Sequence, residues 1–216
     1  MTSETIDTID ELMARYVAGA LPLPASVLVQ SHLAIRTDNH GLVGEMEALA
    51  GAALQDTAPI DVSRRDARLE AIFAAAEPTR PALPVSATGS GIFPQVLRDF
   101  VGMDVDDIPW RTKMPGFREH DVGDIDGCHV SLFWIRPGRK VPQHTHVGSE
   151  LTLILDGAFN DDFGRYGRGD ISVADGQVDH RPIAEMERPC IGFAVVDGRL
   201  QLTGTLRQRL GDIIGR

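Results

Sequence analysis

Hydrophobic residues in the first third of the chain recur every three or four positions, which is the spacing of one helical face. A first stripe runs from Ile9 to Ala20 behind a capping box of Thr8 and Glu11, and Gly19 closes it. Three more helices follow from the same spacing: one over residues 26–35, one capped by Asp38 with the stripe Leu42, Val43, Met46, Leu49, Ala50 and Ala53, and one from Ser63 with Leu69, Ile72, Phe73 and Ala76 on one side. The pattern predicts four short helices.

The stretch from Glu77 to Pro94 breaks this pattern because its prolines and glycines lie among small polar residues. Such a composition suits neither a helix nor a strand, and it is typical of a stiff, extended linker. We therefore divide the chain into a helical part, residues 1–80, a linker, residues 81–93, and a second part, residues 94–216.

The second part opens with a short helix predicted over 94–101 and then changes to a period of two, which indicates strands. Over residues 128–135, both alternating faces are apolar enough to be buried. Further strands are expected near residues 151–155, 169–173, 190–196 and 200–203, between clusters of Gly and Asp. We interpret them as one antiparallel double sheet, a sandwich or a barrel, so the fold class is α + β.

The composition is that of a globular protein with an acidic surface. A chain of 216 residues can bury about 70% of its unfolded surface, enough for a real core. Its formal net charge is −10, and no basic run is present to neutralise phosphates, which argues against direct nucleic-acid binding. Residues 1–80 hold 12 of the 31 acidic and 6 of the 21 basic side chains. This excess suits a basic protein partner, although a plain solvated surface has the same composition.

The sequence shows no sign of membrane insertion or export. No stretch approaches the roughly 20 consecutive apolar residues that a spanning helix needs. The N-terminus is acidic and lacks the basic start and apolar core of a signal peptide. We therefore expect no membrane association and a cytoplasmic location.

Cys128 and Cys190 are the two cysteines of the chain. Two are too few for a disulfide framework or a four-thiolate metal site. We interpret both as reduced core residues, and a redox-sensitive Cys190 beside a metal is the alternative.

Five of the seven histidines lie between His120 and His180, and HTHVGSE places three donor groups close together. Residues two apart on a strand point to the same side, so the imidazoles of His144 and His146 converge, and Glu150 keeps that parity after a short turn. His180 follows a Gly-Asp turn and a strand that can return the chain to this pair. Three imidazoles and one carboxylate suit zinc, iron, manganese or nickel.

Surface histidines of a hairpin, without a metal, are the alternative to this site. The order HxHxxxE, followed by a histidine about thirty residues later, favours the metal. His120 and His129 have no partners at ligand spacing, and we interpret them as ordinary strand residues.

The stretches HTHVGSELTLILDGAF and GRYGRGDISVADGQVDHRPIAE together resemble the cupin domain of the ChrR family, zinc-dependent anti-sigma factors that restrain extracytoplasmic-function sigma factors. YVAGALPLPASVLVQSHLAI, ahead of the linker, is similar to a helix-turn-helix in that family's anti-sigma domain. The resemblance implies a small N-terminal helical bundle that binds and occludes a sigma factor, followed by a cupin domain, which is a double-stranded β-helix or jelly roll. It implies that release follows singlet oxygen or organic peroxide signals, and that the cupin metal ligands are His144, His146, Glu150 and His180.

The chain departs from the family at a second zinc site, which the family builds from an upstream histidine and an HxxxCxxC motif. The matching stretch keeps only His32, because Arg36 has no lone pair for a metal, Asn39 is a poor ligand and the upstream position falls near Asp7. His40 is a weak substitute donor. We therefore expect no zinc in the helical part. Apolar packing must then hold the helices, through residues such as Tyr16, Leu28, Val43 and Met46.

Three function classes are open. The leading hypothesis is a cytoplasmic anti-sigma regulator whose residues 1–80 bind a sigma factor, while a cupin metal, zinc before iron, manganese or nickel, biases bound against released forms under oxidative signals. The alternative is an oxygenase-like cupin metalloenzyme whose helical part has lost sigma binding, although no general base or nucleophile stands out near the ligands. The third is a metal storage or sensor module without a sigma partner. The assembly state is open, a homodimer included.

Overall fold

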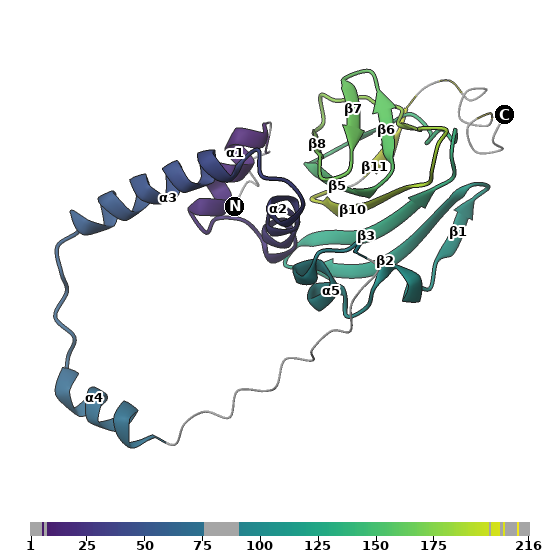
Figure 1. The fold of residues 1–216 in the computed structure, drawn as a ribbon. Coiled ribbons are helices and arrows are strands. Elements are labelled where there is room, and N and C mark those ends of the chain that lie inside the picture. Colours follow the sequence, from purple (N-terminus) through teal and green to yellow (C-terminus); the bar gives the residue numbers. More distant parts are fainter. Residues whose placement is uncertain are drawn as a thin grey trace.

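The computed structural model describes residues 6, 8–75, 91–198, 200–203, 205 and 211, and its helices precede an all-antiparallel β-domain (Figure 1). The helices are α1 (Ile9–Val17), α2 (Leu23–Ile35), α3 (His40–Gln55), α4 (Arg65–Ala74) and α5 (Gln95–Val101), with a 3-10 turn at Val105–Asp107. The strands are β1 (Arg111–Met114), β2 (Phe117–Ile125), β3 (Cys128–Ile135), β4 (His144–His146), β5 (Glu150–Asp156), β6 (Ala158–Asp161), β7 (Gly164–Gly167), β8 (Ile171–Ala174), β9 (Ile183–Ala184), β10 (Cys190–Val196) and β11 (Leu200–Leu202). The α + β class predicted from the sequence is confirmed.

One large sheet and two smaller sheets make up the β-domain. The large sheet has six strands in the order β1-β2-β3-β10-β5-β8. A three-stranded sheet, β7-β6-β9, and a two-stranded sheet, β11-β4, complete the domain, and Figure 1 shows β6, β7 and β11 beside the strands of the large sheet. Every strand pairing is antiparallel, as the alternating pattern predicts.

The central strands of the large sheet are buried on both faces, and β3 shows why. Val130 and Leu132 are fully buried in the core that the sheet shares with the helices. Ser131 and Phe133 point to the opposite side, into the space between the sheets. Because successive side chains of a strand point to opposite faces, one strand serves two cores. The apolar character predicted for both faces over residues 128–135 is thereby explained.

α2 and α5 lie over the outer face of the large sheet, and α1 packs beside α2. α2 packs against β5, β10, α1 and α5, which is why it is apolar on all sides. Phe100 of α5 meets the fully buried Phe193 of β10 edge to face, with ring centroids 6.1 Å apart. Apolar packing holds the helices as predicted: Leu28 and Val43 are buried, and Tyr16 and Met46 pack against the same core.

The helix ends agree with the sequence in the first helix and differ from it in the later ones. Thr8 Oγ1 accepts a hydrogen bond from the backbone of Glu11 at 3.2 Å, and Gly19 adopts a φ of 65° just after α1. Pro24 lies inside the first turn of α2, where a missing N–H costs nothing. Asp38 does not cap α3, because its carboxylate pairs with Arg36 and Asn39 takes the cap position.

The apolar stripes predicted for the third and fourth helices do not face a core over their full length. Val43 is the buried residue of α3, whereas Leu49 and Leu54 are 73% and 72% exposed. α4 starts after Arg64 rather than at Ser63, and none of its residues is buried. Figure 1 shows the reason: α3 projects beyond α1, and α4 stands away from the rest of the protein.

Most of the predicted linker, residues 81–90, lies outside the described residues, so the proposed division stays a prediction. Its last residue, Phe93, is 1% exposed and belongs to the core beneath the helices. The chain ahead of α1 also contacts the β-domain, because the backbone N–H of Ile6 donates to the buried Ser149 Oγ at 3.0 Å. Among the described residues, no helix has both the length and the apolar character needed to cross a membrane.

Candidate metal centre

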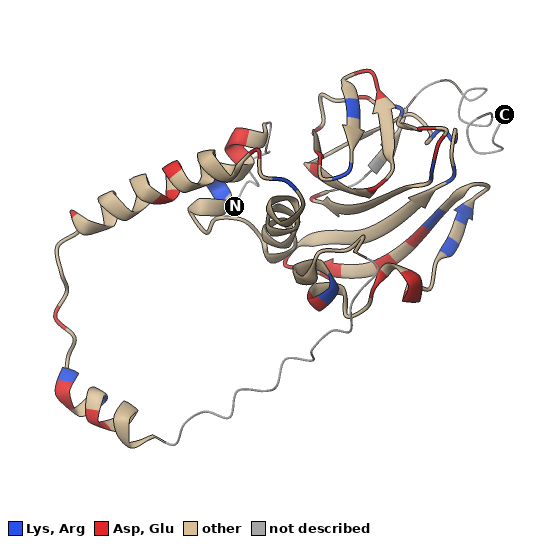
Figure 2. Ribbon diagram, viewed as in Figure 1, with Lys and Arg blue, Asp and Glu red and all other residues tan. Residues whose placement is uncertain are grey.

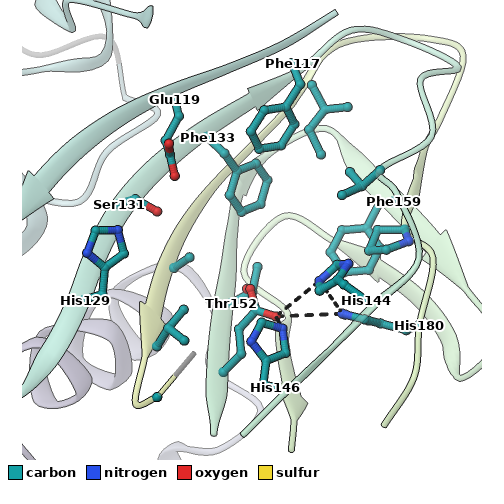
Figure 3. Close-up of a pocket in the computed structure, with 17 residues that line it drawn as sticks. Phe117, Glu119, His129, Ser131, Phe133, His144, His146, Thr152, Phe159 and His180 are labelled. Atoms are coloured by element: carbon teal, nitrogen blue, oxygen red, sulfur yellow. Dashed lines mark hydrogen bonds and ion pairs between the residues drawn. The ribbon is translucent and has the colours of Figure 1, made fainter. Parts of the chain in front are cut away.

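The four residues predicted as metal ligands lie together at one end of the cavity between the sheets (Figure 3). β4 places His144 and His146 on the same side of an extended strand, and both are buried. Glu150 is the first residue of β5. His180 is held beside His144 by two reciprocal backbone hydrogen bonds, each 3.1 Å long. One donor atom from each side chain lies within 4.8 Å of those of the other three.

The distances within this cluster suit one shared ion. Oε2 of Glu150 lies 2.6 Å from Nε2 of His146, 3.7 Å from Nε2 of His180 and 3.8 Å from Nε2 of His144. Nε2 of His144 and Nε2 of His180 are 3.1 Å apart. Atoms bound about 2.0–2.2 Å from a common ion lie about 3–4 Å from one another. Only a small outward shift of His146 is needed for all four to bind it.

His146 supplies an independent sign that an ion belongs here. Its side chain is fully buried, and among the described residues neither ring nitrogen makes a hydrogen bond. Nε2 is close to Glu150 but lacks the direction of a hydrogen bond. A buried polar atom without a partner costs about 1–3 kcal/mol. A metal ion would give Nε2 its missing partner, so the four side chains of the cluster fit a metal ion.

The other ring nitrogens orient two of the imidazoles. Nδ1 of His180 donates to Asp161 Oδ2 at 3.0 Å, and the Asp161 side chain is 1% exposed. Nδ1 of His144 donates to the carbonyl of Pro142 at 2.8 Å. Because the Nδ1 proton is held in both rings, the neutral form of each imidazole directs the lone pair of Nε2 at the cluster. Such partners fix both the tautomer and the angle of a metal-binding imidazole.

The electrostatics of the cluster keep its carboxylate ionised. Burial raises the pKa of Glu150, but the close contacts of its carboxylate with the imidazoles of His144, His146 and His180 outweigh burial and hold the pKa well below its usual range. Burial lowers the pKa of His180, but Asp161 and then Glu150 outweigh that effect and raise it to about 9. Thr152 donates to the other oxygen of Glu150 at 3.3 Å, which orients the carboxylate.

Asp161 is the site residue that the sequence analysis missed. It ends β6, and its Oδ1 accepts backbone N–H groups from Phe163 and Gly164 at 2.9 and 3.1 Å. The run Asp-Asp-Phe-Gly, with its aspartates ahead of a glycine, indicates such a turn in the sequence. Its second role, toward His180, depends on how β6 lies against residues 19 positions later, which no local pattern reveals.

The cluster borders a cavity of about 320 Å³. Three imidazoles and a carboxylate are donors for a borderline divalent ion, and four protein ligands leave room for a further small ligand on a six-coordinate ion. The opposite wall is formed by β2 and β3, with Phe117, Glu119, Ser131 and Phe133 pointing inward (Figure 3). The cavity therefore extends well beyond the four donors.

The other candidate residues stay outside the cluster. His120 lies in β2, and His129 in β3 sits at the cavity wall beside Asp124, with 3.1 Å between His129 Nδ1 and Asp124 Oδ1. Cys128 and Cys190 are both free and buried. Burial raises the pKa of the Cys128 thiol to about 11 and that of Cys190 to about 12, which suits core residues.

The stretch that matches the family's second zinc site makes direct polar contacts instead. His32 is buried; its Nδ1 donates to the carbonyl of Gly169 at 2.6 Å, and its Nε2 lies 2.9 Å from the Asn39 amide. Arg36 contacts Asp170 at 2.7 Å, next to Gly169. His40 Nε2 lies 2.8 Å from the carbonyl of Leu33. Asp7 lies outside the described residues. Nδ1 of His32 thus joins α2 to the loop before β8, and Nε2 joins α2 to the N-cap residue of α3.

Comparison with known proteins identifies both parts of the chain. A family model described as the ChrR cupin-like domain matches residues 98–199. The anti-sigma-E factor ChrR of Cereibacter sphaeroides is 34% identical over 202 residues, which cover 91% of this chain and 92% of that protein. A crystal structure of Rhodobacter sphaeroides SigE in complex with the anti-sigma ChrR matches with a TM-score of 0.73 and 34% identity, over 88% of this chain and 97% of that one. Since this similarity covers the helices as well as the β-domain, the chain belongs to the ChrR family of anti-sigma factors, and its β-domain is a cupin.

Proposed function

We propose that this chain is a cytoplasmic anti-sigma factor that binds an extracytoplasmic-function sigma factor through residues 1–80, and that a metal ion on the cupin cluster controls the binding. The 34% identity with an anti-sigma-E factor supports this function over that of a metalloenzyme. The similarity to a ChrR chain that was crystallised with SigE supports a sigma factor as the partner.

The observation that carries the proposal is an exposed apolar surface between Leu49 and Phe73. Large hydrophobic side chains of α3, α4 and the segment between them are open to solvent, namely Leu49, Leu54, Ile60, Val62, Ile72 and Phe73. Ile60 and Phe73 are 89% and 83% exposed. A helix of ten residues with no buried side chain gains nothing from packing and is marginal alone in water. So many exposed apolar side chains in one stretch of the chain favour a protein-binding role for it.

The charges on this surface suit a partner with basic regions. Figure 2 marks acidic residues along α3 and within α4; they are Glu45, Glu47, Asp66 and Glu70, and α4 also carries the basic residues Arg65 and Arg68. A sigma factor binds DNA and therefore presents basic surface. Acidic groups around an apolar strip would steer such a partner to it and add specificity.

The direct test is capture of a sigma factor by the full chain. The tagged chain is co-expressed with each extracytoplasmic-function sigma factor of the source organism, and retained protein is measured. We expect one sigma factor to be retained, and Phe73→Glu to weaken its binding about 30-fold, the effect of losing a contact worth about 2 kcal/mol. Met186→Glu, at a residue of the cupin that is 78% exposed, is the matched control. Retention of no sigma factor, or equal loss in the control, contradicts the proposal.

Zinc is the proposed ion, on the four donors His144, His146, Glu150 and His180. We expect about one zinc per purified chain and none in the double variant His144→Ala, His146→Ala, with the helical circular dichroism signal preserved. Full metal content in the double variant would refute the ligand assignment.

The oxidative signal is proposed from the family resemblance. Treatment of the complex with an organic hydroperoxide or a singlet-oxygen source is expected to release the sigma factor. The same treatment should fail with the double variant, because the ion that couples the signal to binding is then missing. Equal release from both proteins would place the sensor elsewhere in the chain.

A further inference from the structure

The cavity beside the metal cluster has a second polar end that the proposed function does not use. It lies on β2 and β3, across the cavity from the histidines (Figure 3). Glu119 and Ser131 point inward there from neighbouring strands, in diagonal positions of the register that pairs Glu119 with Phe133. The middle of the cavity between these two ends is apolar.

Aromatic rings form that apolar middle. Phe117 and Phe133 stack with their planes 17° apart and their centroids 6.3 Å apart, and Phe159 faces them from β6. Gly192 of β10 lies behind Phe133, and a Cβ there would overlap the Phe133 ring. The glycine therefore lets this ring lie back against the sheet, which keeps the cavity open.

Ser131 offers a hydroxyl to the cavity. The residue is 6% exposed and lines the cavity wall beside Glu119. Glu119 beside it contacts Lys113 Nζ through Oε2 at 2.7 Å, and its carboxylate lines the cavity as a hydrogen-bond acceptor. A ligand hydroxyl at this point can donate to Glu119 and accept from Ser131. The wall beside them gives access, because the His129 side chain is 44% exposed.

The other end of the cavity, at the metal cluster, favours a negatively charged ligand group. Three neutral imidazoles and one carboxylate leave a divalent ion with one net positive charge. A volume of about 320 Å³ is at the lower end of the range for small-molecule sites, which limits the ligand to a single ring with short substituents.

We propose that this cavity binds a small hydroxylated aromatic monocarboxylate, with its ring among Phe117, Phe133 and Phe159, its hydroxyl at Ser131 and Glu119, and its carboxylate at the metal cluster. The inference rests on the proposed metal site and names a ligand that this site would take. Because the large sheet separates the cavity from the helical layer, such a ligand would bind opposite the elements that carry the sigma-binding surface.

The test measures binding of three probes to the zinc-loaded full chain by calorimetry. 4-Hydroxyphenylacetate is expected to bind with one-to-one stoichiometry. Phenylacetate, which lacks the hydroxyl, and 4-hydroxyphenylethanol, which lacks the carboxylate, should each bind about tenfold more weakly. Chelated protein should lose the preference for the carboxylate.

Two variants assign the contacts. Ser131→Ala is expected to reduce the tenfold preference for the hydroxylated acid to about threefold or less. Ser172→Ala, at a buried serine outside the cavity wall, is the control and should leave the preference unchanged. Gly192→Ala should weaken all three probes, because its methyl group pushes the Phe133 ring into the cavity. Thermal melting shows whether each variant is folded.

The inference is overturned if the zinc-loaded protein shows no saturable binding of 4-hydroxyphenylacetate at millimolar concentration. It is also overturned if the three probes bind equally well and Ser131→Ala changes nothing. Metal content and sigma-factor capture are measured on the same preparations. A chain that holds zinc and retains its sigma factor but binds no probe refutes the ligand alone, whereas a chain without zinc refutes the metal site.

Discussion

Replacing Asp161 by Asn tests whether the contact behind His180 shapes the metal site. Asp161 uses Oδ2 for Nδ1–H of His180 and Oδ1 for the backbone N–H groups of Phe163 and Gly164. An asparagine has one oxygen for both tasks. If that oxygen stays with the turn, the amide N–H groups face the Nδ1–H of His180. The imidazole must then move its proton to Nε2, where it blocks metal binding, or turn away.

The expected size of the effect follows from these contacts. The pair is buried, with 1% exposure for the Asp161 side chain and 5% for that of His180, so water cannot replace the lost acceptor. Loss of a partner behind a metal-binding histidine lowers metal affinity by about 10–100-fold. That range corresponds to about 1.4–2.8 kcal/mol at 25 °C.

Competition with a chromophoric zinc chelator at neutral pH measures this affinity. Asp162→Asn is the matched control, because Asp162 is exposed and one residue further along the same turn. We expect the control to keep the affinity of the unmodified protein. Unchanged affinity in Asp161→Asn, with the variant fully folded, would show that this carboxylate does not orient the imidazole. Equal losses of zinc affinity in both variants would mean that the removed negative charge, and not the contact with His180, is responsible.

Three further predictions concern the rest of the protein. Arg36→Ala should lower the free energy of unfolding in urea by no more than about 1 kcal/mol, because the side chains of Arg36 and Asp170 are 35% and 31% exposed. The exchange Arg36→Asp with Asp170→Arg should recover part of this loss. A double-mutant cycle that shows no coupling energy between the two residues would mean that the ion pair does not stabilise the protein. Phe193→Ala should cost about 3–5 kcal/mol in the same assay, since the ring is fully buried between the sheet and the helices, and a cost below about 1 kcal/mol contradicts that packing. Cys128 and Cys190, with thiol pKa values raised by burial to about 11 and about 12, should resist a disulfide reagent at pH 8 until the protein is denatured, and rapid reaction of the native protein would contradict their burial.

The convergence of His144, His146 and His180 was predictable because each step rests on local geometry. Strand alternation puts the first two imidazoles on one side, and a turn followed by a strand returns the third. The same alternation identified β3 and β10 almost to the residue. Where hydrophobic residues alternate strictly and both faces of the strand are buried, the sequence pattern defines the bounds of the strand closely.

The outer helices were predicted less well because an apolar stripe does not say what covers it. Val43 packs on the core, but Leu49 is exposed, although both belong to one predicted stripe. A surface kept for another protein has the same composition as a surface that faces the protein's own core. The exposed part of the stripe thus agrees with the sequence once a partner is included.

Contacts between distant parts of the chain that no local repeat indicates could not be predicted. From the sequence, Arg36 was described only as a residue that cannot bind zinc. No neighbouring residue in the sequence predicts its ion pair with Asp170, 134 residues away. The second polar end of the cavity was also invisible, because Glu119 and Ser131 meet only through the register of two strands. Such pairings depend on tertiary packing, which single-sequence periodicity does not contain.

The hydrogen bond from Ile6 to Ser149 joins the chain ahead of the first helix to the residue next to Glu150. Linkage between two binding events is reciprocal: each changes the affinity of the other by the same factor. If binding of a sigma factor moves Ile6 away from Ser149, it changes the affinity for the metal by the same factor by which the metal changes the affinity for the sigma factor. The concentration of free zinc in the cell would then affect the release of the sigma factor, because both ligands bind through one linked equilibrium.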